Sequence, residues 1–285
     1  MKVLFTTYLF LFLSFSFSQV FNQGYGNTEF KNLLANGITY VKTGHIYFDS
    51  IMVQMLEHHW KFTSYTVIER YKEPEKNSTA LFITTQKPVR EHQQDRKNAR
   101  IITLMPAKFF DEGADYENVP VDISKTLGYM YFNGFHDLIR SEDEYRYIMM
   151  MLNCLQEGLA IIKENQLTDV EVVLNENISK NIYENHKTLV GNTLILHRDQ
   201  ATHFIDMEKV KTSGIKYRLL ADEEYHNVLD EANPLHYLLY FGENKYTEMS
   251  LIRIATGEMI YTKHFPQEYL KIGKKETKVL FGYFK

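Results

Sequence analysis

The sequence predicts an α/β protein made of two similar small modules, each with the order β-α-β-α-β-β, whose mixed sheets are flanked by helices and joined by a long central helix. Three observations predict this fold. Strand-like runs alternate with stretches of helical periodicity in the second half of the chain. The first half repeats this order of elements, although few residues are identical. One long amphipathic stretch, which begins near Tyr145, separates the two halves.

An irregular segment opens the first module, because glycines interrupt residues 19–39. We expect a strand over residues 45–48 and then a helix over residues 51–59, which Asp49 or Ser50 caps. Runs rich in β-branched and aromatic side chains predict further strands at residues 64–68, 80–85, 100–105 and 128–132.

The acidic run at residues 141–144 (Ser-Glu-Asp-Glu) forms a capping box and suits the positive end of a helix dipole. The central helix is therefore expected to run from there to about Asn165. In the second module, the same reasoning predicts strands at residues 192–196, 215–220 and 235–241, helices at 201–210 and 222–232, and a final hairpin of residues 250–254 and 258–263 around Ala255-Thr256-Gly257.

The first residues have the features of a cleavable signal peptide. Lys2 precedes an apolar run to Phe17, and the small residues Ser16 and Ser18 place cleavage before Gln19. The run is shorter than the ~20 apolar residues of a membrane-spanning helix. We therefore expect a periplasmic or secreted protein without an integral membrane segment after signal cleavage. The domain boundaries follow as signal peptide 1–18 (Met1 to Ser18), first module with an insert 19–140, central helix and linker 141–190, and second module 191–285.

Composition limits the function classes. The chain is 44% hydrophobic and 24% charged, which is typical of a globular protein. A formal net charge of −4 without an evident basic run argues against nucleic acid as a partner. Cys154 is the only cysteine, so no internal disulfide can form, and its apolar helical surroundings indicate a buried structural thiol.

The second module resembles a known family. The stretch from Tyr217 to Leu220, the Asp222 helix, the Leu235 strand and the hairpin over residues 254–260 are similar to the small α/β module of the N-terminal region of TolB and of CsgG-like envelope proteins, in which a Thr-Gly-Glu turn also joins the last two strands. The similarity covers mainly residues 192–265, and the polar linker at residues 243–245 departs from it. The overall layout also resembles uncharacterised secreted proteins of the Bacteroidetes. The resemblance implies envelope assembly or protein interaction without catalysis, and it assigns no functional residue.

Two histidine clusters are the candidates for chemistry. His58 and His59 are adjacent, so their side chains diverge on a helix and cannot easily bind one metal ion together. His197, Asp199 and His203 follow a strand end, where sites in α/β sheets gather, but three residues without a further partner are too few to define a metal or catalytic site. No catalytic, cofactor-binding or metal-binding residues are therefore assigned, and no cofactor is expected.

These observations favour a non-catalytic envelope protein that binds another envelope protein, and they leave a homo-oligomer open. This function predicts an exposed apolar or aromatic patch outside the core. A periplasmic hydrolase or metal-dependent enzyme with a site near His197 is an alternative, which predicts a polar cleft. A carrier of a small ligand is a further alternative, which predicts a closed apolar cavity.

Overall fold

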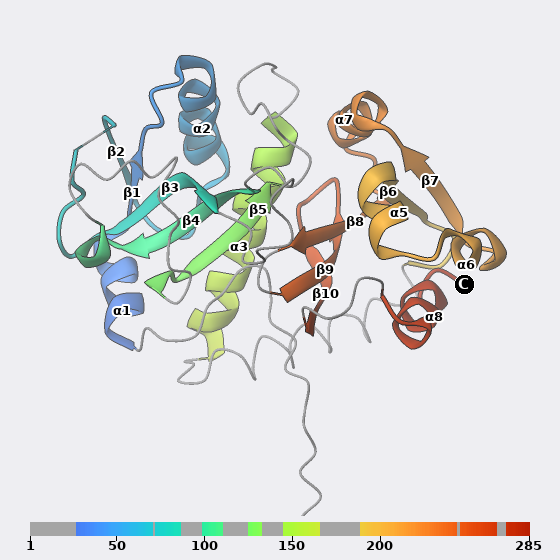
Figure 1. Cartoon of the computed structure of the whole chain (residues 1–285). Helices are drawn as coiled ribbons and strands as arrows, with labels where there is room; N and C mark the ends of the chain where they lie inside the picture. The colour runs from blue at the N-terminus through green and yellow to red at the C-terminus, as the bar shows by residue number, and fades with distance from the viewer. Residues whose placement is uncertain are drawn as a thin grey trace, which may run out of the picture.

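The computed structural model describes residues 27–70, 72–86, 99–110, 125–132, 145–165, 189–243, 246–266 and 272–285 (Figure 1). The expected signal peptide and the capping box at residues 141–144 lie outside this part of the chain, as does the linker after the central helix, over residues 166–188.

The first sheet has the strand order β2-β1-β3-β4-β5. Strand β1 runs parallel to its two neighbours β2 and β3, and the β3-β4 and β4-β5 pairs are antiparallel. The strands are β1 (Ile38–Val41), β2 (Tyr65–Ile68), β3 (Thr79–Gln86), β4 (Ala99–Pro106) and β5 (Gly128–Phe132).

The second sheet repeats this arrangement, with the order β7-β6-β8-β9-β10. Here β6 runs parallel to β7 and β8, and β8, β9 and β10 pair in antiparallel fashion. The strands are β6 (Thr193–His197), β7 (Lys216–Leu220), β8 (His236–Glu243), β9 (Tyr246–Arg253) and β10 (Met259–Pro266). The predicted α/β fold with two similar modules and mixed sheets is therefore confirmed.

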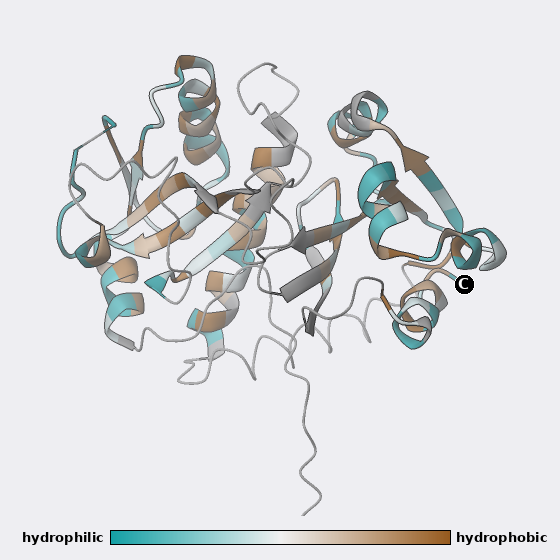
Figure 2. Cartoon of the chain, in the orientation of Figure 1, coloured by the Kyte–Doolittle hydropathy of each residue, from teal (hydrophilic) through white to brown (hydrophobic). Residues whose placement is uncertain are grey.

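Helices cover these sheets. The first module contains α1 (Asn27–Asn36), α2 (Ile46–His59), the short 3₁₀ helix η2 (Ala107–Phe109) and α3 (Tyr145–Asn165). The second contains α5 (Arg198–Phe204), α6 (Met207–Thr212), α7 (Asp222–Glu231) and α8 (Lys274–Gly282). Both α2 and α8 carry hydrophobic and hydrophilic residues (Figure 2), as expected of helices that face a sheet on one side and water on the other.

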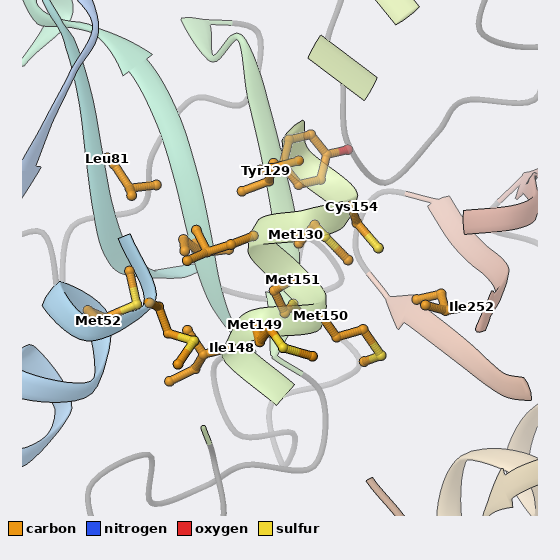
Figure 3. Close-up of a cluster of buried hydrophobic side chains, with 14 of the residues drawn as sticks. Met52, Leu81, Tyr129, Met130, Ile148, Met149, Met150, Met151, Cys154 and Ile252 are labelled. Atoms are coloured by element: carbon orange, nitrogen blue, oxygen red, sulfur yellow. The ribbon is translucent and has the colours of Figure 1, made fainter. Parts of the chain in front are cut away.

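Helix α3 lies between the two sheets. One hydrophobic cluster contains Leu81 of β3 together with Leu238 of β8 and Ile252 of β9. All five residues from Ile148 to Leu152 are buried, although successive residues of a helix point in different directions. In Figure 3 the α3 side chains lie between Met52 and Leu81 on one side and Ile252 on the other. The layers thus follow the order first sheet, α2 and α3, second sheet, and then α5, α6 and α8, whose apolar residues form a second cluster with the far face of that sheet.

A turn of the second module locks onto α3. Asn153 Nδ2 donates to the carbonyl oxygen of Thr256 at 2.9 Å, and the Cys154 thiol donates to that of Gly257 at 2.8 Å. Gly257 has a φ of 74°, and a Cβ atom there would lie 2.9 Å from the Asn153 Cβ. Burial raises the pKa of the Cys154 thiol, in keeping with a structural role.

Three sequence predictions were wrong. Residues 27–36 and 38–41 form α1 and β1 rather than an irregular segment, because Gly37 turns the chain sharply at a φ of 74°. Residues 46–48 form the first turn of α2 rather than a strand. The helix expected over residues 201–210 is two helices, since Asp206 starts α6 by accepting a hydrogen bond from the Glu208 amide. The sequence also gave no expectation of α8.

Among the described residues, no helix combines the length and apolar character needed to cross a membrane.

Candidate functional site

The strand order singles out two equivalent places, the carboxyl ends of β1 and β6. From each of these strands the chain moves to the neighbour on one side and then returns to the neighbour on the other side. Sites in open α/β sheets gather at such switch points, because the loops that leave the strands diverge there. We therefore describe the residues that follow β1 and those that follow β6.

A buried carboxylate organises the loop after β1. Asp49 is only 6% exposed, and its Oδ1 atom accepts hydrogen bonds from the Tyr40 hydroxyl at 2.7 Å, the Thr43 amide at 2.9 Å and the Thr43 hydroxyl at 3.0 Å. Its Oδ2 atom accepts from the Gly44 amide at 2.9 Å. The Thr43 hydroxyl in turn accepts from the His45 amide at 3.1 Å. The carboxylate therefore fixes the path of the chain into α2.

The electrostatics of this network favour a neutral tyrosine. Burial raises the pKa of the Tyr40 hydroxyl well above its usual value, and the negative charge of Asp49 raises it further. Gly44 adopts a φ of 89°, and a Cβ atom there would lie 3.2 Å from Arg70 Cδ. The loop thus depends on a glycine conformation as well as on the carboxylate.

This fixed loop presents two large apolar side chains to solvent. Ile46 is 82% exposed and Tyr47 is 77% exposed, whereas Phe48 is 2% exposed and belongs to the core. Figure 1 shows the helix that begins with this pair, α2, at the top of the first module. We call Ile46 and Tyr47 the α2 tip. The β-branched and aromatic residues of the run His-Ile-Tyr-Phe, residues 45–48, are the reason that a strand was expected there.

The equivalent end of β6 is built differently. His197, the last residue of β6, is 6% exposed, and its ring packs edge-on against that of Tyr225 in α7, with 5.0 Å between ring centroids. Asp199 is exposed on α5, and the half-buried His203 packs on Phe204 at 4.6 Å. Of the three sequence candidates, His197 therefore lies in the interior, Asp199 lies on the surface and His203 is half-buried.

Within the described part of the chain, no three His, Cys, Asp or Glu side chains come together in a way that could hold a metal ion.

His58 and His59 end α2, beside a clamp between α2 and α3. The side-chain amide of Gln156 donates to the His59 carbonyl oxygen at 2.8 Å and accepts from the Lys61 amide at 2.5 Å. Trp60, 3% exposed, donates from its indole nitrogen to the Thr63 hydroxyl at 3.2 Å. This end of α2 therefore serves packing between the helices.

His236, the first residue of β8, is the buried histidine with the clearest electrostatic signature. It is 9% exposed, and its Nδ1 atom has no hydrogen-bond partner among the described residues. Burial lowers its pKa, nearby Arg218 lowers it further, and Glu231 partly opposes this shift. His236 therefore favours the neutral form in the folded protein.

Comparison with known proteins adds no relative: no protein-family profile, curated protein or solved structure matches this chain.

Proposed function

We propose that this is an exported, non-catalytic protein of the cell envelope that binds another protein through the α2 tip. The observation that carries this proposal is the exposure of Ile46 and Tyr47 next to a loop that Asp49 holds in place. A single exposed apolar residue is ordinary. Two adjacent large apolar side chains at the end of a fixed loop are a better candidate for a binding surface, since the loop loses little conformational freedom when a partner covers them.

The chemistry of the tip indicates the kind of partner surface. Tyrosine is enriched among residues that dominate protein interfaces, because it offers a large rigid ring with a polar end. Covering an isoleucine and a tyrosine contributes about 2 kcal/mol each. An apolar pocket with a hydrogen-bond acceptor for the Tyr47 hydroxyl would suit both side chains. Export rests on the leader sequence, and it places this partner in the envelope.

Photo-cross-linking in the native host tests the proposal. A photoreactive phenylalanine analogue replaces Tyr47 in one strain and Leu235 in another; Leu235 is 58% exposed in the second module and serves as the control. We expect a discrete adduct from position 47 and not from position 235. Adding Ile46→Ser to the position-47 protein should remove that adduct, because half of the apolar surface is lost.

Two results would reject the proposal. The first is the same set of adducts from positions 47 and 235, or an adduct that persists with Ile46→Ser, either of which would mean unspecific contact. The second is hydrolysis of model esters or peptides by the purified protein that His197→Ala abolishes. That outcome would favour the enzyme alternative at the end of β6.

A further inference from the structure

Helix α8 carries a stripe of lysines on its outer side. Its inner side, formed by Thr277, Leu280 and Phe281, is buried, the two apolar residues against the second sheet. Lys275 and Lys278 lie three residues apart on the outer side and are both exposed. Beyond α8, the amides of residues 283–285 donate i→i−3 hydrogen bonds that continue the helical path. This path ends at Lys285, which is also exposed.

The charge of this region contrasts with that of the rest of the chain. Residues 271–285 contain five lysines and one glutamate, which gives a side-chain charge of +4, whereas the whole chain carries −4. Val279, 46% exposed, lies within the lysine stripe. A molecule with this distribution is attracted to an anionic surface by α8 and repelled from it elsewhere, so it approaches in one orientation.

The residue types indicate which anionic surface. Lysine is depleted at protein interfaces, where arginine and aromatic residues are enriched. The nearest ring, that of Tyr283, is half-buried against the second sheet and offers little face on which bases could stack. Flexible lysines around one aliphatic side chain suit the surface of a bilayer, where each ammonium group meets phosphate at no fixed position. We propose that α8 binds the surface of a membrane that contains anionic phospholipids, reversibly and without insertion of a helix.

This binding would set the direction of the α2 tip. Helix α2 lies at the upper edge of the first module and α8 at the lower edge of the second (Figure 1). With α8 on the bilayer, α2 would lie on the side of the molecule away from the membrane, where a partner could reach it. Membrane binding does not depend on the proposed protein partner, so the two proposals can fail separately.

Co-sedimentation with vesicles tests the inference. The purified protein is mixed at low salt with vesicles of phosphatidylcholine alone or of phosphatidylcholine with phosphatidylglycerol. We expect binding only to the anionic vesicles, and its loss at about 1 M salt, where the Debye length is about 3 Å. Replacing two lysines in the variant Lys275→Gln/Lys278→Gln should weaken binding roughly 30-fold, since each lysine near an anionic surface contributes about fivefold.

Helix α6 supplies the matched control. Lys209 forms an ion pair with Asp206 at 3.1 Å, and Lys211 forms one with Glu208 at 2.7 Å. The variant Lys209→Gln/Lys211→Gln removes the same charge from the same module. This control should bind almost as the unaltered protein does. Equal losses in the two double variants would overturn the proposed stripe. Binding to both vesicle types, to neither, or preferentially to polyglutamate would overturn the bilayer as its partner.

Discussion

Replacing Asp49 with alanine should loosen the first module and its α2 tip together. The carboxylate accepts four hydrogen bonds, from the Tyr40 hydroxyl, from the amide and hydroxyl of Thr43, and from the Gly44 amide. The Tyr40 side chain is fully buried, so its hydroxyl would lose its acceptor without reaching water. The amides lie in a partly exposed loop, where water can replace part of what they lose.

The magnitude follows from these environments. A buried hydroxyl left without an acceptor costs about 2 kcal/mol, and the two half-exposed amides of Thr43 and Gly44 add about 0.5–1 kcal/mol each, whereas the part-buried Thr43 hydroxyl can turn to water at little cost. We therefore expect Asp49→Ala to lower the free energy of unfolding by about 3–4 kcal/mol. Asp49→Asn keeps the shape and one acceptor oxygen, so it should lose about half as much.

Urea unfolding followed by circular dichroism measures this loss, and Glu57→Ala is the control. Glu57 is an exposed acidic residue on the same helix, and its replacement should change the free energy of unfolding by no more than about 0.5 kcal/mol. Hydrogen exchange of residues 43–48 should accelerate in Asp49→Ala but not in Glu57→Ala. Equal stability of the two variants would refute the idea that the carboxylate holds this loop.

Three further predictions concern the interior. Tyr40→Phe should reduce the loss of stability at alkaline pH. Because the folded-state pKa of Tyr40 is raised, the contribution of the neutral Tyr40 to the free energy of unfolding is complete below its ordinary pKa of 10.0 and declines above it. Urea unfolding at several pH values measures this decline. His236 has a lowered pKa, so the contribution of the neutral His236 to the free energy of unfolding is complete above pH 6.5 and declines at lower pH. His236→Gln should remove this acid dependence in the same titration. Gly257→Ala should destabilise by about 3 kcal/mol, because it adds a clash with α3 to the strain of a positive φ, whereas Gly214→Ala, with a φ of 76° and open space around it, should cost about 1 kcal/mol in thermal unfolding. Equal losses in the two glycine variants would contradict the contact between the turn and α3.

Much of the fold could be predicted because local pattern and tertiary structure agree there. The strands at Tyr65–Ile68 and Lys216–Leu220 are rich in β-branched, aromatic or alternating apolar residues, and α3 repeats apolar residues at helical spacing. The start of the first module was predicted wrongly because β1 follows directly on α1 through Gly37, so no separate loop marks where the helix ends and the strand begins. A short strand beside a glycine carries too little periodicity to stand out.

The candidate site was less predictable, for a physical reason. Asp49 looked like a helix cap, yet its side chain reaches back to donors at residues 40–44, a set of contacts that only the folded loop defines. Ile46 and Tyr47 carry the signature of buried residues, so their exposure is visible only in the structure. His197 was correctly placed at a strand end, but its burial against Tyr225 could not be read from spacing.

The location of the protein and the mass of its mature form test most directly the claim on which the proposed partner depends. Host cells are fractionated, and intact mass spectrometry is applied to the protein recovered from each fraction. We expect the chain outside the cytoplasm, beginning at Gln19 after cleavage of its apolar signal peptide. Recovery from the cytoplasm with Met1 still in place would contradict export, and an envelope partner for the α2 tip would have to be abandoned with it.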